Sequence, residues 1–157
     1  MDTIRERCLK NLVTTLQTIK TANGYDNTVE DLAVQRFKQN GQPLSVGNNL
    51  LIIYEGEDET DEQPLTLTTH RLAVAIQVLA RYDEAADPRS GAEVCNSLMG
   101  DVLKAVLGDV TRGGVAIETL HTGASPLAED AQKLLLEFFM GFEITYRHRF
   151  ADPKVAT

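Results

Sequence analysis

The chain has 157 residues, 43% hydrophobic and 24% charged residues and no Trp, which suits one soluble domain with a mostly aliphatic core. Its formal net charge of −8 argues against a protein that grips nucleic acid by its phosphates, because such binding needs clustered Lys and Arg, but it does not exclude a wall past which DNA slides. No apolar run approaches the roughly 20 residues that span a bilayer, and the charged N-terminus is unlike a signal peptide, so we expect a cytoplasmic origin and no membrane contact.

The chain opens with an amphipathic helix, which we predict over residues 3–22. Thr3 and Glu6 have the spacing of a capping box, which satisfies free N–H groups at a helix start. Gly24 lies just past the periodic segment and is placed to end the helix. The apolar stripe recurs at helical spacing and comprises Ile4, Cys8, Leu9, Leu12, Val13, Leu16 and Ile19.

Strands are predicted next, over about residues 28–37, 50–55 and 66–82. The spacing in the first also allows a short helix, and we favour the strand. The second is a short apolar run. The third alternates with period two over an unusual length, and its β-branched residues favour a strand over a helix at 72–79. The acidic residues 55–62 predict a solvated loop rather than a cation site, because they lack the alternating ligands of an EF-hand.

A second helix is predicted over residues 89–107. Its cap lies either at Asp87, followed by a first-turn proline, or in a capping box that starts at Ser90. Strands over residues 115–122 and 137–150 complete the chain.

Strands therefore occur in runs rather than alternating with helices. This order predicts a single α+β domain over residues 1–157, with a mostly antiparallel four- to five-stranded sheet and two long amphipathic helices packed on one face. The strands at 66–82 and 137–150 are overlong, since about 13 residues span roughly 43 Å. Such strands either curl around the core or project beyond it to contact another subunit.

The motifs of known catalytic and ligand sites do not occur: there is no phosphate loop, dinucleotide fingerprint, zinc-protease helix or serine-hydrolase elbow. We therefore expect no enzyme activity, no catalytic residue, no cofactor and no metal site. His70 and His148 have matching phase on the two long strands and meet if those strands pair. We expect two partly exposed strand histidines rather than a metal or acid–base pair. Cys8 and Cys95 lie in apolar helical patterns and are expected to be buried thiols, because a reducing compartment disfavours a disulfide.

Several stretches, taken in order, resemble the small minor tail proteins of long-tailed bacteriophages, in the tail-terminator or tail-completion group that includes minor tail protein U. They are the opening helix "IRERCLKNLVTTLQTI", the strand "HRLAVAIQVLARYDEAADP" with the following helix "LMGDVLKAVLGD", the strand "GGVAIETL" and the closing "GFEITYRHRFADP". The resemblance spans most of the chain and is least clear over residues 25–64.

This resemblance implies a structural protein of the virion tail, made in the cytoplasm of a bacterial host. Copies of the chain would form a ring, commonly a hexamer, that caps the completed tail tube, stops its growth and prepares attachment of the head. The implied partners are other copies of the chain, the tail-tube protein and a head–tail connector protein. DNA would pass through the ring without specific binding.

The acidic stretch and two late arginines are our candidates for an assembly interface or lumen. They are Glu57, Asp58, Glu59, Asp61, Glu62, Arg147 and Arg149. The arginines share the polar phase of the last strand and suit cross-strand or inter-subunit salt bridges. We expect the acidic loop and residues 121–130 to become ordered only on assembly.

Three alternatives remain open. Another neck or connector component belongs to the same structural class. A small cytoplasmic enzyme or ligand-binding domain would need a pocket, for instance around His70 and His148. A bacterial regulatory interaction domain is the third.

Overall fold

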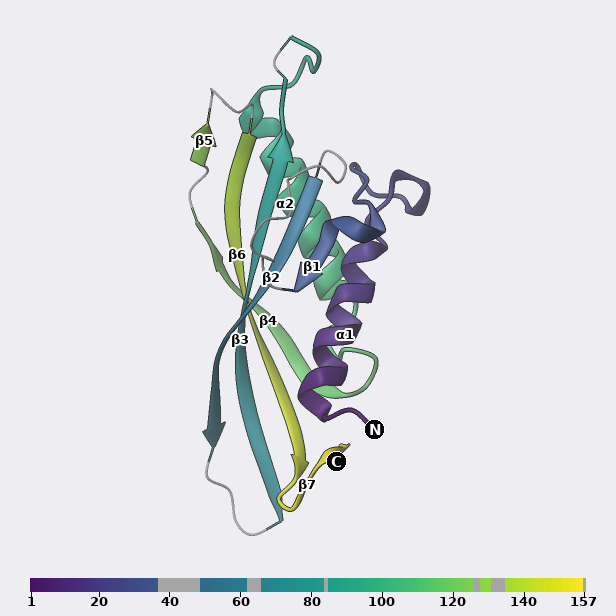
Figure 1. The fold of residues 1–157 in the computed structure, drawn as a ribbon, viewed down its shortest axis with the longest axis vertical. Coiled ribbons are helices and arrows are strands. Elements are labelled where there is room, and N and C mark those ends of the chain that lie inside the picture. Colours follow the sequence, from purple (N-terminus) through teal and green to yellow (C-terminus); the bar gives the residue numbers. More distant parts are fainter. Residues whose placement is uncertain (37–48, 62–65, 84, 126–127, 131–134, 157) are drawn as a thin grey trace.

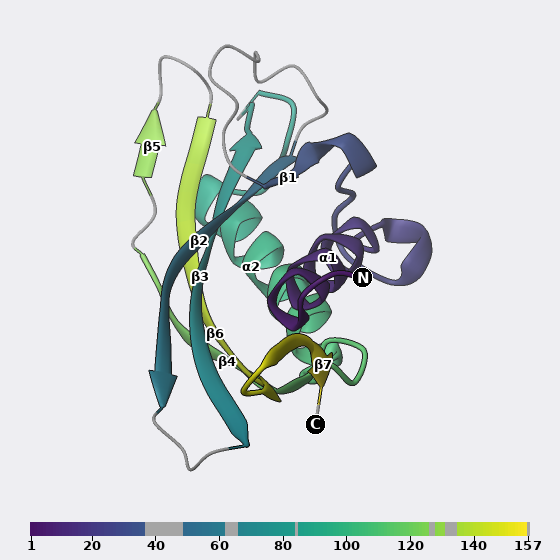
Figure 2. The same ribbon diagram turned by 60° about the horizontal axis from the view of Figure 1, so that its bottom comes forward.

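A computed structural model describes residues 1–36, 49–61, 66–83, 85–125, 128–130 and 135–156. Its helices are α1 (Ile4–Gln17) and α2 (Gly91–Gly108), with 3-10 turns η1 (Thr21–Asn23) and η2 (Asp31–Ala33). Its strands are β1 (Val34–Arg36), β2 (Asn49–Asp61), β3 (Leu67–Arg81), β4 (Ala116–Ala124), β5 (Ala128–Asp130), β6 (Leu135–Arg149) and β7 (Asp152–Ala156). Both helices lie on one face of a curled sheet (Figures 1 and 2), so the chain has the predicted α+β class.

The sheet is mixed, which corrects the prediction of a mostly antiparallel sheet. Its main path has the order β1-β2-β3-β6-β4, roughly as many strands as the predicted four to five, and within the described residues the short strands β5 and β7 each pair with β6 in addition. β1 runs parallel to β2, and the remaining pairs are antiparallel. Residues 37–48 separate β1 from β2, and a connection of about a dozen residues is long enough for a parallel crossover. β5 and β7 are too short for alternation to reveal them.

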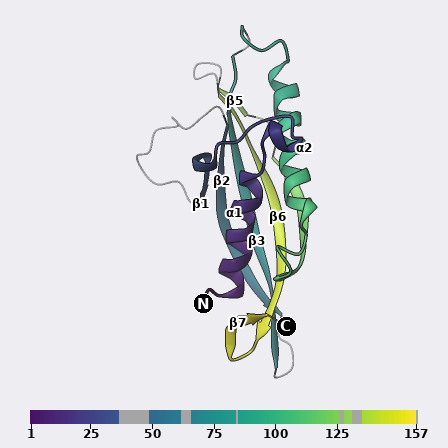
Figure 3. The same cartoon turned by 90° about the vertical axis from the view of Figure 1, so that its right-hand side faces the viewer.

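The two long strands, β3 and β6, form the spine of this sheet. Each has 15 residues, and they pair antiparallel from Leu67↔Arg149 to Arg81↔Leu135. The predicted pairing of two overlong strands is therefore confirmed. The sheet twists strongly along its length, and the start of β3 and the end of β6 extend past the first turn of α1 (Figures 1 and 3).

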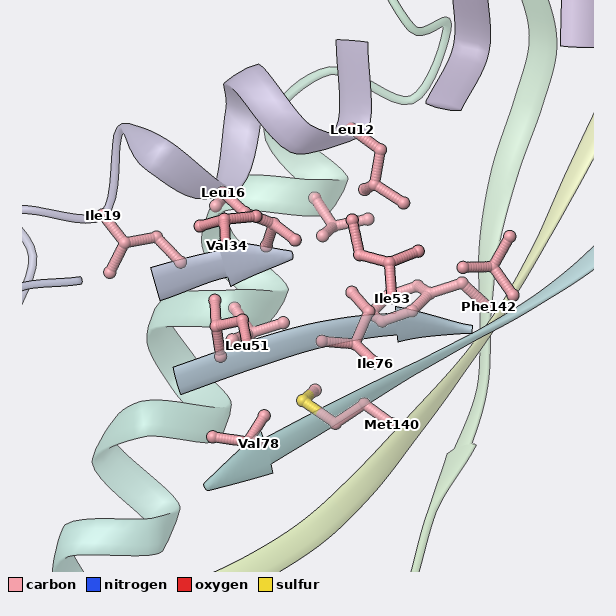
Figure 4. Close-up of a cluster of buried hydrophobic side chains, with 14 of the residues drawn as sticks. Leu12, Leu16, Ile19, Val34, Leu51, Ile53, Ile76, Val78, Met140 and Phe142 are labelled. Carbon is pink, nitrogen blue, oxygen red and sulfur yellow. The ribbon is translucent and has the colours of Figure 1, made fainter. Parts of the chain in front are cut away.

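The core lies between the helices and the inner face of the sheet. α1 contributes buried residues at helical spacing, and Figure 4 shows Leu12 and Leu16 pointing toward the strands that carry Val34, Leu51 and Ile53. Burying each such side chain stabilises the fold by about 1.5–3 kcal/mol. The strand residues buried here include Leu51, Ile53, Leu72, Val74, Ile76, Val78, Phe138, Met140, Phe142 and Ile144.

The helix ends follow local chemistry. Of the two predicted caps of α2, Ser90 is the one used, in a complete capping box with Glu93. α1 ends at Gln17, earlier than the predicted residue 22, because its last turn tightens: the N–H groups of Thr18 and Ile19 donate to the carbonyls three residues before them. Among the helices of the described chain segments, none combines the length and hydropathy of a membrane span. Cys8 and Cys95 are buried free thiols, as predicted.

The acidic stretch is a strand, which corrects the predicted loop. β2 runs to Asp61, whereas the sequence predicted a strand over residues 50–55 only, and its acidic half pairs with β3. Arg71 lies opposite Glu59 and donates to it and to Asp61, at 3.3 and 3.2 Å. Cross-strand ion pairs of this kind stabilise a sheet. They are not visible in the sequence of either strand alone, so the acidic stretch was predicted to be a loop.

Two further segments differ from the prediction. The strand predicted over residues 28–37 is η2 followed by the three residues of β1. The strand predicted over residues 115–122 is β4, which runs two residues further, and the loop expected after it holds the end of β4 and all of β5. β4 approaches β6 closely at Gly141, where a Cβ atom would lie 2.5 Å from the Thr122 hydroxyl.

Candidate functional site

Polar side chains replace apolar ones where the first turn of α1 faces β1, β2, β3 and β6. We call this group the Asp58 cluster, and its members are Arg5, Glu6, Arg36, Glu55, Asp58, His70, Tyr146 and His148. Tyr146 and His148 continue the alternation of the inner face of β6 beyond Ile144. The charged side chains of the cluster are between 7% and 36% exposed, so they are partly shielded from water, and ionic contacts there are stronger than at a fully exposed surface.

A β-bulge places two carboxylates of β2 on the same face. The residues from Glu55 to Asp58 advance three positions while their partners on β3 advance two, so one extra residue is accommodated. Both carboxylates then face α1, although strict alternation would turn Glu57 inward instead. Gly56 occupies the bulge, where a Cβ atom would lie 3.2 Å from Ala73 Cβ.

Glu55 links three elements of the fold. Its side chain is only 7% exposed, and it accepts hydrogen bonds from Arg36 of β1 and from Arg5 of α1, the latter at 2.8 Å. The other side of the Arg36 guanidinium binds Glu6 at 2.8 Å. Burial lowers the pKa of Arg36, but its hydrogen bonds to Glu6 and Glu55 outweigh burial and raise that pKa above its ordinary value.

Asp58 is the second acceptor of the cluster. Its Oδ2 accepts from the Tyr146 hydroxyl at 2.7 Å and lies 3.2 Å from Arg5 Nε, while its Oδ1 lies 3.0 Å from His70 Nδ1. Burial and the neighbouring Asp58 raise the pKa of Tyr146, so its hydroxyl stays protonated and donates. The Tyr146 ring stacks on His70 with centroids 4.9 Å apart.

The two strand histidines meet. His70 Nε2 and His148 Nε2 are 3.0 Å apart, because β3 and β6 pair along their whole length. His148 Nδ1 in turn lies 2.7 Å from the carbonyl oxygen of Arg149. The sequence predicted two partly exposed strand histidines that would meet if their strands pair, and the structure brings the two rings together, with each ring held at Nδ1.

The predicted assembly residues separate into different environments. Asp58 belongs to the cluster, Glu57 is exposed, and Glu62 lies outside the described residues. Arg147 donates to Thr69 at 3.0 Å, and Arg149 is exposed at the end of β6. Their role in assembly stays a prediction.

Half of the eight cluster members were not predicted as site residues. Arg5, Arg36, Glu55 and Tyr146 were not singled out. One signal in the sequence could have found them: a polar residue at a position that the alternation of the strand assigns to the buried face. Tyr146, between Ile144 and His148, is such a residue.

The described residues of this region do not include a metal-binding group larger than a pair of side chains. Within the described segments, no group of three or more His, Cys, Asp or Glu side chains is arranged to hold a metal ion. An open hollow lies beside Leu67, Arg149 and Phe150 at the end of the sheet, and the histidine pair does not line it.

Comparison with known proteins gives a fold but no family. No protein-family model matches the chain. No curated protein matches it in sequence. Among solved structures, a chain of the "Virion of native gene transfer agent (GTA) particle" is similar, with a TM-score of 0.50, 11% sequence identity, and coverage of 93% of this chain and 92% of that chain. At such low identity the likeness shows a shared fold over nearly the full length of both chains.

Proposed function

We propose that this chain is a structural protein of a phage-like virion, and specifically a tail-terminator or tail-completion subunit. The observation that carries the proposal is the fold shared, over 93% of this chain, with a chain of a gene transfer agent virion. The resemblance of the helix and strand sequences to minor tail proteins of long-tailed phages supports the same class independently.

In this function the subunits form a ring at the end of the tail tube. A closed ring requires a head-to-tail interface, in which two different surfaces of the subunit meet. The end of the sheet formed by β2, β3 and β6 supplies one such surface, because it extends past the helical layer (Figure 1). Its outer face carries both signs of charge, with Glu59, Asp61, Arg71 and Arg147 on adjacent strands.

Control of tail length would follow from competition at the tube end. A bound ring covers the surface to which the next tube subunit would add. The face of the ring that points away from the tube then receives the connector protein of the head. The acidic balance of −8 suits the wall of a channel through which DNA passes, because like charges prevent sticking.

Deleting the gene in its phage or prophage tests the proposal. We expect overlong tail tubes by negative-stain electron microscopy, and tubes of normal length when the chain is supplied in trans. Detached tails of normal length would assign a connector role instead. Complete particles of normal number and infectivity would refute a structural role.

Charge reversal tests the assembly surface. Glu57→Lys and Arg149→Glu are expected to preserve the far-UV circular dichroism spectrum and to prevent assembly of tails. Glu30→Lys, an exposed carboxylate beside η2, is the matched control and is expected to assemble. Normal assembly of both test variants would show that this end of the sheet is not the interface.

A further inference from the structure

The hydrogen bonds around the histidine pair determine where its protons lie. His70 Nδ1 faces a carboxylate oxygen of Asp58 at 3.0 Å, and His148 Nδ1 faces a backbone carbonyl at 2.7 Å. A carbonyl oxygen can only accept a hydrogen bond, and so can the oxygen of an ionised carboxylate. Each Nδ1 therefore carries the proton that it donates. In two neutral rings, each Nε2 then presents a lone pair, and the two lone pairs face each other across 3.0 Å.

Two lone pairs at this distance repel each other, and a cation that binds both nitrogens removes the repulsion. The charged groups around the pair also favour one: Arg5 and Arg36 oppose Glu6, Glu55 and Asp58, which leaves one negative charge in the cluster. Either a shared proton or a metal ion would supply the missing positive charge.

We propose that His70 and His148 bind one divalent transition-metal ion of the class that prefers imidazole nitrogen, namely Zn²⁺, Ni²⁺ or Cu²⁺. With bonds of about 2.1 Å, two nitrogens 3.0 Å apart subtend an angle of about 90° at the ion. This angle is found in tetragonal sites and needs only a small opening of the pair to become tetrahedral.

The surroundings are those of metal-binding histidines. In such sites the second ring nitrogen characteristically donates to a carboxylate or a backbone carbonyl, which fixes the tautomer and the ring orientation. Here Asp58 and the Arg149 carbonyl have these two roles. The stacking of His70 on Tyr146 holds its ring further. The His70 side chain is 16% exposed, so an ion has access from solvent and water completes its coordination.

Calorimetric titration of the chelator-treated protein with ZnCl₂ and NiCl₂ tests the site. We expect one equivalent to bind saturably to the wild type and to His121→Gln. His121 is the matched control, because it lies on β4 against Phe142. His148→Gln is expected to abolish binding, and Asp58→Asn to weaken it by about 10–100-fold, the usual effect of removing a carboxylate that orients a ligand.

Nuclear magnetic resonance of the wild type keeps the test decisive if a variant fails to fold. Zn²⁺ is expected to shift the imidazole signals of His70 and His148 and to leave those of His121 unchanged. Two results would overturn the proposal: equal binding by wild type and His148→Gln, or ring signals that respond to pH but not to metal, which would show a shared proton only.

Discussion

Replacing Glu55 with Gln is expected to destabilise the fold by removing the charge that holds two arginines. The Glu55 side chain is 7% exposed and binds Arg36 and Arg5, which come from β1 and α1. The neutral amide retains one acceptor oxygen, but its NH₂ group faces the guanidinium donors. Both arginines are then left partly buried with an incomplete set of acceptors.

The magnitude follows from how much water reaches the pair. Breaking a buried ion pair costs about 3–5 kcal/mol, and an exposed pair contributes about 0–1 kcal/mol. Arg5 and Arg36 are 36% and 26% exposed, and each has a second carboxylate, Asp58 and Glu6. We therefore expect a loss of about 2–3 kcal/mol, which lowers the Tm of a chain of this size by about 5–10 °C.

Urea unfolding at pH 7, followed by far-UV circular dichroism, measures this loss. Glu59→Gln is the matched control, because it removes a carboxylate that is 65% exposed and also paired with an arginine. Its expected cost is below about 0.5 kcal/mol. The reasoning is refuted if Glu55→Gln costs less than about 1 kcal/mol or no more than the control.

Three further predictions concern the scaffold. Asp101→Ala is expected to lower the unfolding free energy by about 2–3 kcal/mol, because the buried carboxylate accepts from the backbone N–H groups of residues 26 and 27, and these groups lose their partner. Hydrogen exchange at those two amides should accelerate, and unchanged exchange would contradict the prediction. Gly141→Ala is expected to destabilise the fold by about 1–3 kcal/mol through its close contact with β4, whereas Gly100→Ala, which has open space in α2, should stabilise it by up to about 1 kcal/mol. Urea unfolding measures both changes, and equal effects of the two variants would refute the steric argument. Burial raises the pKa of the Cys8 thiol from 9.0 to about 11. The stabilisation linked to this shift, about 2–3 kcal/mol of unfolding free energy, is therefore complete below pH 9 and lost as the pH rises toward 11. The unfolding free energy should fall more steeply over this range in wild type than in Cys8→Ala, and parallel pH profiles would contradict the prediction.

Local periodicity accounts for the parts of the fold that were predicted. The apolar stripes of α1 and α2 and the alternation along β3 and β6 each depend on neighbours in sequence, so they are visible in one strand or one helix at a time. The Ser90 cap of α2 was visible for the same reason, since its partner Glu93 is three residues away. The possible approach of His70 and His148 also followed from equal phase on two strands, once those strands were taken to pair.

The remaining features depend on contacts between distant residues. The acidic half of β2 has the composition of a loop, and it is a strand because its backbone pairs with β3, where Arg71 also donates to Glu59 and Asp61. The parallel pairing of β1 with β2 is a contact between distant segments, which composition does not encode.

The sequence by itself therefore determined which segments are amphipathic and how long the two central strands are, because side-chain periods of 3.6 and 2 are properties of the local chain. Only the tertiary structure decided which polar side chains meet. One extra residue in the bulge beside Gly56 turns Asp58 inward, toward His70 and Tyr146. A shift of one position exchanges the two faces of a strand, and no local pattern records where that shift occurs.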